Sequence, residues 1–141
     1  MKKKITCETI VAGKSLAQYD REWVEMPGGF SVPHPELYGK AGLFRAVEHG
    51  EVVAVGKGAG RPANRLSGRL YDHRRPGDSG RRYRAGQYIH ANMDRLRLEV
   101  LITGDDHAAC QLADKLLGPM KELYSPRENV PASIVKQVAF G

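Results

Sequence analysis

The amino-acid sequence predicts an α+β fold, in which a small, mainly antiparallel sheet is flanked by helices and preceded by an N-terminal extension. Three observations favour this class: two β-rich runs close together, helical periodicity on both sides of residue 80, and a later run of alternating apolar residues. The elements expected in chain order are strands at 43–47 and 52–55, helices at 64–74 and 83–93, a strand at 96–102 and a helix after Asp105 or Asp106. The predicted order is therefore β-β-α-α-β-α.

The first two strands are expected to form a hairpin, because the connection between them is short and contains Gly50. The helix at 64–74 is indicated by Leu66 and Leu70, which lie one turn apart with basic residues around them. In the helix at 83–93, Tyr88 and Ile89 are expected to face inward.

The strand at 96–102 is indicated by apolar residues that alternate along it. Asp105 or Asp106 can cap the helix that follows, because a carboxylate accepts hydrogen bonds from the free N–H groups of a first turn. The apolar side of this helix is expected at Leu112, Leu116 and Leu117. Gly118-Pro119 is expected to break or kink it.

The length of 141 residues predicts a single domain. We expect residues 1–41 to form the N-terminal extension, with a short helix within 16–24, and residues 42–141 to form the core domain. Cys7 and Cys110 lie far apart without a CxxC motif, which excludes a disulfide framework and a thiolate zinc site. No apolar run approaches the roughly 20 residues that cross a bilayer, so we expect a soluble, cytoplasmic protein with no membrane partner.

Positive charge is concentrated between Lys57 and Arg84. This stretch holds nine basic and two acidic residues, a net charge of +7, whereas the rest of the chain carries −1. Eight of the nine cations are arginines, whose planar guanidinium binds phosphate oxygens in pairs. A solvated loop is the alternative interpretation, but the arginine content favours a polyanionic partner, above all nucleic acid. The candidate nucleic-acid-binding residues in this stretch are Arg61, Arg65, Arg74, Arg75, Arg81 and Arg82.

A series of short motifs runs through the same region. In order they are Gly42-Leu43-Phe44, Ala54-Val55-Gly56, Lys57, Arg69-Leu70-Tyr71-Asp72-His73, Leu123-Tyr124-Ser125-Pro126 and Asn129. This order resembles that of the GIY-YIG nuclease family over about residues 42–129. The resemblance implies that Gly42, Phe44 and Gly56 are structural motif residues of the hairpin.

The resemblance also implies an endonuclease that hydrolyses phosphodiester bonds, most often of DNA, with Mg²⁺ or Mn²⁺ as cofactor. The residues that it implies are Lys57, Arg69 and His73 for catalysis, Asp114 for the metal and Asn129 for the nucleic acid. Arg69 would neutralise charge on the scissile phosphate, and His73 shares its helix face because the two are four residues apart. Arg65, one turn before Arg69, is an alternative for the same role. The implied site is one cationic pocket between the end of the hairpin and the following helix.

The chain departs from the family pattern at three points. Phe44 and Ala54 stand where the family has tyrosines, and neither side chain can accept a proton. The metal-binding Glu of the family falls near Ala113 or Asp114. In a catalytic chain the attacking water would be oriented by His73, Lys57, Tyr38 or Tyr71. The alternative is a module on the same scaffold that binds nucleic acid, or an acidic protein partner, without cleavage.

Two other enzyme classes are excluded by spacing and context. The glycine-rich segment 56–60 is not a Walker loop, because Gly58 stands where Ser or Thr would bind Mg²⁺. Cys110 lies among small apolar residues rather than in the electropositive setting that activates a thiolate.

Overall fold

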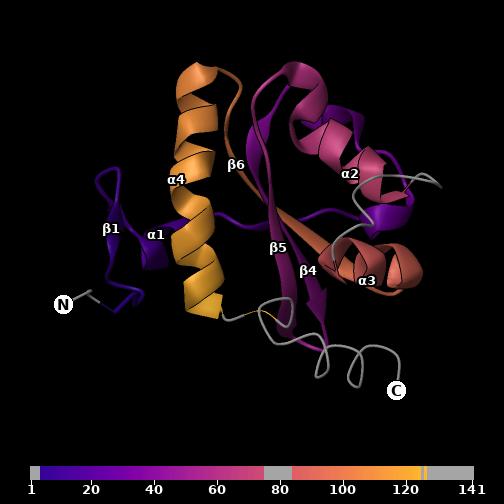
Figure 1. Cartoon of the computed structure of the whole chain (residues 1–141), viewed down its shortest axis with the longest axis horizontal. Helices are drawn as coiled ribbons and strands as arrows, with labels where there is room; N and C mark the ends of the chain where they lie inside the picture. The colour runs from indigo at the N-terminus through magenta and orange to yellow at the C-terminus, as the bar shows by residue number, and fades with distance from the viewer. Residues whose placement is uncertain (1–3, 75–83, 125, 127–141) are drawn as a thin grey trace.

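The computed structural model describes residues 4–74, 84–124 and 126. Its main sheet has four antiparallel strands in the order β3 (Val24–Glu25), β6 (Arg97–Gly104), β4 (Ala41–Glu48) and β5 (Glu51–Gly58). Helix α4 (His107–Tyr124) covers one face of this sheet, and α2 (Leu66–Arg74) and α3 (Arg84–Asn92) lie on the other (Figure 1). The predicted α+β class and the order β-β-α-α-β-α are confirmed.

The N-terminal segment adds small elements around this core. A two-stranded hairpin, β1 (Ile10–Val11) and β2 (Lys14–Ser15), leads into the short helix α1 (Leu16–Asp20), and both lie beside α4 in Figure 1. Single 3₁₀ turns follow at η1 (Gly29–Ser31) and η2 (Pro35–Leu37), and a third, η3 (Pro62–Asn64), precedes α2. The segment before residue 42 therefore supplies an edge strand, β3, to the same sheet as the rest of the chain.

The sheet separates two apolar cores because successive side chains of a strand point to opposite faces. Leu43 and Leu101 face α4 and pack with Leu16 and Tyr19 of α1. Phe44, next along β4, faces the other way into the larger core. That core contains, among others, Phe30, Leu37, Leu66, Leu70, Tyr88, Ile89, Leu98 and Val100. The inward positions predicted for Tyr88 and Ile89 are thus confirmed, and Leu66 and Leu70 lie in the same core.

The β4–β5 hairpin closes through a two-residue turn. His49 and Gly50 both have positive φ values, 52° and 79°. Two such residues in succession match the twist of the flanking strands, which is the usual geometry of a two-residue hairpin loop. The turn sets Glu48 opposite Glu51, and a register shift between Val47 and Ala46 then sets Phe44 opposite Gly56 and Leu43 opposite Lys57.

Helix α4 begins where the sequence predicts but continues further. The Oδ1 atom of Asp106 accepts a hydrogen bond of 2.8 Å from the N–H of Ala109, which confirms an aspartate cap. Of the two outcomes expected at Gly118-Pro119, a break is wrong, since one helix runs from His107 to Tyr124 with Pro119 inside it, and a kink stays a prediction. Gly118 removes one obstacle to this continuity, because a glycine before proline has no Cβ to collide with the proline ring in helical conformation.

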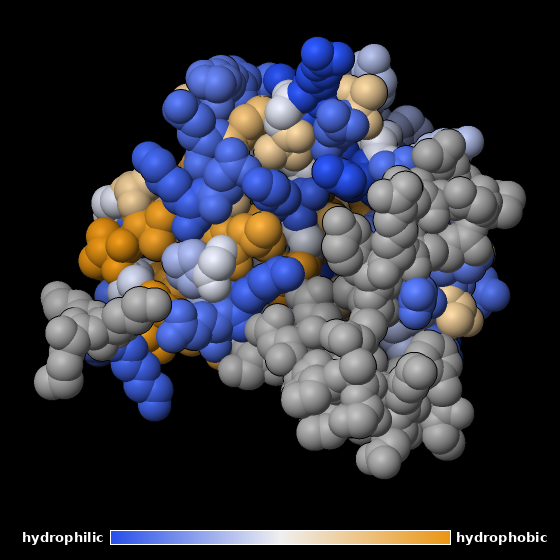
Figure 2. Space-filling model, viewed as in Figure 1, coloured by the Kyte–Doolittle hydropathy of each residue, from blue (hydrophilic) through white to orange (hydrophobic). Residues whose placement is uncertain are grey.

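Some apolar side chains are exposed at the surface, in particular beside β1. On the face seen in Figure 2, hydrophilic side chains cover the upper end of α4 and apolar ones gather beside β1. Ile10 of β1 is 63% exposed. Within the described ranges of the chain, no helix is long and apolar enough to cross a membrane.

Substitution of Gly42 by alanine is expected to destabilise the central strand pair. A Cβ atom at this position would lie 2.2 Å from the carbonyl oxygen of Leu101, a backbone atom of the neighbouring strand β6. Relief of such an overlap requires the two strands to separate, which costs about 1–3 kcal/mol. Urea unfolding followed by circular dichroism measures the change, and an unaltered midpoint would contradict this packing.

Candidate nucleic-acid interface

Lys57 and Asp114 meet on the face of the sheet that α4 covers. Lys57 lies near the end of β5, opposite Leu43, and its ammonium forms an ion pair with the carboxylate of Asp114 on α4. The two side chains are 41% and 52% exposed. A pair this exposed contributes only about 0–1 kcal/mol to stability, so it can open at little cost.

His73 lies on the opposite face of the sheet. Its ring packs edge-on against Phe44, with 5.4 Å between ring centroids, and its backbone carbonyl accepts a hydrogen bond of 2.8 Å from Nδ1 of His90. Gly56 makes room for Phe44, because a Cβ there would be 2.3 Å from Cζ of that ring. Phe44 therefore contacts both Gly56 of the hairpin motif and His73 of the helix motif.

The four polar residues that the resemblance implies do not gather around one point. The sheet lies between the Lys57–Asp114 pair and the Phe44–His73 contact. Arg69 is exposed on α2, four residues before His73 on the same side of the helix. The structure thus brings the implied groups together as two separate pairs, and their catalytic roles stay predictions.

Arg65 is bound within the protein itself. Its guanidinium donates hydrogen bonds to three backbone carbonyls, those of Gly60 at 3.1 Å, Gly39 at 2.9 Å and Asp105 at 2.9 Å. These carbonyls belong to three different loops, which precede β4, α2 and α4. The geometry gives Arg65 a role in fixing these loops, beside the phosphate contact that the sequence predicts for it.

Replacement of Arg65 by methionine is expected to lower the free energy of unfolding by about 1–3 kcal/mol. The substitution keeps the length of the side chain but leaves the three loop carbonyls without their common donor. Arg61→Met, at an exposed position in the same segment, is the matched control and should stay within about 0.5 kcal/mol. Equal urea midpoints for the two variants would contradict the proposed loop-fixing role.

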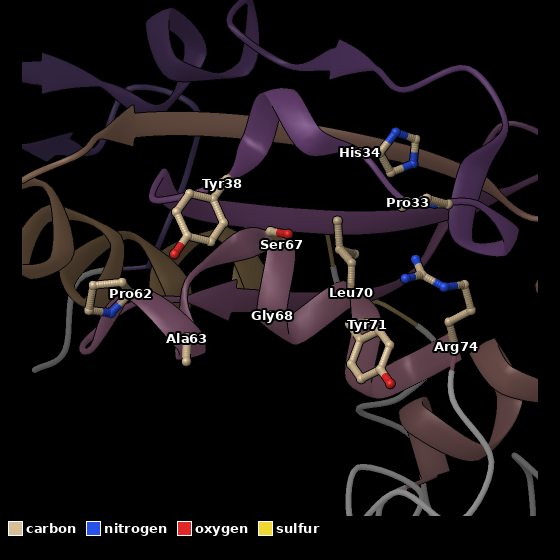
Figure 3. A pocket seen from close by; sticks show the side chains of 10 residues that line it. All are labelled: Pro33, His34, Tyr38, Pro62, Ala63, Ser67, Gly68, Leu70, Tyr71 and Arg74. Carbon is tan, nitrogen blue, oxygen red and sulfur yellow. The ribbon is translucent and has the colours of Figure 1, made fainter.

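A pocket of about 290 Å³ opens between α2 and the loop before β4. Its lining comes from that loop, from η3 and from one side of α2. The lining residues are Pro33, His34, Tyr38, Pro62, Ala63, Ser67, Gly68, Leu70, Tyr71 and Arg74. In Figure 3, Pro62 and Ala63 lie at one end, and His34, Pro33 and Arg74 lie at the other.

Two tyrosines border this pocket at the protein surface. Tyr38 is 75% exposed and Tyr71 is 49% exposed, although both carry large rings. The guanidinium carbon of Arg74 lies 5.3 Å from the centroid of the Tyr71 ring, a cation–π contact. The pocket therefore combines flat aromatic surfaces with a positive charge.

Helical spacing divides the polar residues of α2 between two flanks. Ser67, Tyr71 and Arg74 follow one another at intervals of four and three, so they share the flank that faces the pocket. Arg69 and His73 share a different flank. Cationic groups are thus available on both sides of α2.

From the sequence, Tyr38 and Tyr71 were predicted only as groups that could orient water. The sequence could not show that these two tyrosines border one pocket.

A second polar cluster lies on the α4 face and involves Arg45 of β4. Its Nε donates to Oε1 of Glu99 at 2.8 Å, and its guanidinium carbon lies 4.3 Å from the ring centroid of Trp23. Tyr124 completes the cluster, because its hydroxyl accepts from Nε1 of Trp23 at 2.9 Å and donates to Asp20. These contacts join α1, α4 and the sheet, a structural role that the sequence did not indicate.

The stability of the fold is expected to fall at alkaline pH, in part through Tyr124. Burial raises the pKa of this hydroxyl above its usual value near 10, and the hydrogen bond to Asp20 acts in the same direction. Below pH 10 the group is neutral in both states, whereas above it the unfolded chain loses the proton first. Above pH 10, ionisation of Tyr124 in the unfolded chain therefore lowers the free energy of unfolding by up to about 1.4 kcal/mol per pH unit. Tyr124→Phe should flatten the dependence in urea unfolding, and an unchanged slope would contradict it.

Several predicted residues lie outside the described part of the chain, namely Arg75, Arg81, Arg82 and Asn129. Of the remaining candidates, Arg61 is exposed, Arg69 is exposed and Arg74 is half-buried beside Tyr71. Gly42 and Gly56 serve close packing within the hairpin and its neighbour β6.

The binding of Mg²⁺ or Mn²⁺ that the resemblance implies stays a prediction, with Asp114 as the residue that would hold the metal. Asp114, the ligand that the resemblance implies, is engaged by Lys57. Within residues 4–74, 84–124 and 126, no three His, Cys, Asp or Glu side chains form a cluster. Mg²⁺ is commonly bound by one or two carboxylates together with substrate phosphates.

Comparison with known proteins does not assign a family. Neither the protein-family models, nor the curated proteins, nor the solved structures contain a significant match to this chain.

Proposed function

We propose that this protein binds nucleic acid, with DNA as the preferred form, through the sugar–phosphate backbone. The observation that carries the proposal is the cationic surface formed by η3 and α2. Arg61 and Arg69 are exposed there, and Arg74 lies beside an exposed tyrosine. The whole excess of positive charge in the chain belongs to the stretch that includes these residues.

Arginine and tyrosine together favour nucleic acid over an acidic protein. Guanidinium groups bind phosphate oxygens in pairs, and tyrosine rings offer flat surfaces on which bases stack. An acidic protein surface would use the same charges, and tyrosines also occur at protein interfaces. The pairing of guanidinium groups with stacking surfaces matches the pairing of phosphates with bases in nucleic acid, and on this ground we take nucleic acid as the partner.

Fluorescence anisotropy with labelled DNA tests the proposal. The full chain is titrated into a duplex, a single strand and an RNA of the same sequence, with polyglutamate as a competing polyanion. The proposal is supported if the chain binds nucleic acid and if polyglutamate, added at the same concentration of negative charges, does not displace it. Displacement by polyglutamate at equal charge, or no binding to any of the three, would overturn it.

We propose phosphodiester cleavage as a second candidate function. The contact between Phe44 and His73 supports it, because it brings the hairpin motif against the helix motif. Arg69, on the same side of α2 as His73, would stabilise charge on the phosphate. Lys57 and Asp114 lie on the other face of the sheet and have no part in this arrangement.

Cleavage is tested on plasmid and single-stranded DNA across a titration of Mg²⁺ and Mn²⁺. Arg69→Ala is expected to abolish cleavage, since the loss of one group that stabilises transition-state charge costs about 10²–10³-fold. Intact substrate after long incubation with the wild-type chain in excess would rule out this candidate and leave binding alone.

A further inference from the structure

The pocket beside α2 has the features of a site for one flat ring. Its volume of about 290 Å³ is just below that of small-molecule sites, which span roughly 300–1,000 Å³, so it is small enough for a single ring. Apolar side chains such as Leu70 and Pro62 line it together with the polar groups of Ser67 and Arg74. Such a lining suits a planar group that is apolar on its faces and polar at its edge.

The loop that carries Tyr38 is held in place by a buried side chain and by hydrogen bonds. The preceding residue, Leu37, is only 1% exposed and anchors the loop in the core. The N–H of Tyr38 donates to the carbonyl of Pro35 at 3.1 Å, and Nε2–H of the buried His34 donates to the carbonyl of Gly29 at 2.6 Å. The ring of Tyr38 is therefore exposed while the loop that carries it is fixed, so little conformational entropy is lost when a ligand contacts it.

The other wall of the pocket is equally constrained. Tyr71 projects from α2, and Gly68 allows η3 to approach this helix so closely that a Cβ would be 1.7 Å from the carbonyl oxygen of Ala63. Arg74, next to Tyr71, sets a positive charge at the end of the pocket. An aromatic ring with a neighbouring guanidinium can stack a base and hold the phosphate attached to it.

We infer that this pocket receives one unpaired base of single-stranded DNA, with Tyr38 and Tyr71 as the aromatic rings that line its path and Arg74 on an adjoining phosphate. The inference rests on the proposed binding of nucleic acid and narrows it to strands with accessible bases. Bases in a duplex are already stacked and cannot enter, so the pocket adds affinity for single strands alone.

The test compares Tyr38→Ala and Tyr71→Ala with the wild-type chain by anisotropy, on a thymidine single strand of about 16 nucleotides and on a matched duplex. Each variant is expected to bind the single strand about 5- to 150-fold more weakly, the usual effect of losing one base–aromatic stack. Binding to the duplex should change less than about twofold. Tyr38→Phe and Tyr71→Phe keep the ring and should bind as the wild type does.

Val24→Ala is the control for loss of an exposed apolar side chain, because Val24 is 55% exposed on the far edge strand. Circular dichroism verifies that each variant is folded. Alanine variants that bind the single strand as tightly as the wild type would overturn this inference and leave the proposed function intact. A wild-type chain that binds neither DNA would instead overturn the proposed function, and the inference with it.

Discussion

Replacement of Arg61, Arg69 and Arg74 by glutamate is expected to weaken DNA binding by about 10³-fold. Each arginine supplies a charge-assisted contact to a phosphate, and the loss of one such contact costs roughly tenfold in affinity. Arg61, just before η3, and Arg69 on α2 are exposed, and Arg74 is half-buried at the end of α2, so circular dichroism is used to verify that the variant is folded. Arg65 is left unchanged because it holds three loop carbonyls.

A matched control separates this local effect from the loss of net charge. Lys4, Arg21 and Lys115 are exposed residues outside the cationic stretch, and their replacement by glutamate changes the net charge by the same amount. The control variant should lose less than about tenfold in affinity at 150 mM salt, where charges more than about 8 Å away are largely screened. Equal losses in both variants would mean that binding depends on net charge and not on the surface of α2.

Substitution of Gly68 by alanine is expected to destabilise the protein by about 3 kcal/mol, at the upper end of what overpacking costs. The new Cβ would lie 1.7 Å from the carbonyl oxygen of Ala63 and 2.7 Å from its carbonyl carbon. Both are backbone atoms, so the overlap is relieved only if η3 moves away from α2. Because both elements line the pocket, this movement should also weaken binding of single-stranded DNA.

Ser67→Ala, the neighbouring position on the same helix, is the control for Gly68→Ala. Alanine is a better helix former than serine, and Ser67 is partly exposed. The free energy of unfolding of Ser67→Ala should therefore stay within about 0.5 kcal/mol of that of the wild type. The two variants are compared by urea unfolding. If Gly68→Ala unfolds at the same urea concentration as Ser67→Ala, the close approach of η3 to α2 is not as described.

Much of the fold could be predicted from periodicity because the strongest signals are local. Alternation in β6, the leucine spacing of α2 and the aspartate before α4 each depend on residues a few positions apart. At Pro119 the sequence left open a break or a kink, and the helix does not break there. Gly118 has no Cβ, which removes one of the clashes that a proline makes with the residue before it.

The candidate site was harder to predict because its parts meet only through tertiary packing. Residues four apart on α2 were correctly expected to share a side, but the sequence could not show that the sheet lies between Lys57 and His73. Likewise, Tyr38 and Tyr71 border one pocket although they are far apart in the chain. In the sequence, nothing distinguishes Arg65 from the exposed arginines on either side of it. Its structural role follows only from its hydrogen bonds to three loop carbonyls.

Affinity for DNA measured as a function of salt concentration tests the central claim most directly. If the cationic stretch contacts about six phosphates, the logarithm of the binding constant should fall linearly with the logarithm of salt concentration, with a slope near −5 for a duplex. Affinity would then drop about 10³-fold between 50 and 200 mM salt. A slope near zero, or the absence of binding at 50 mM salt, would contradict recognition of the phosphate backbone by this protein.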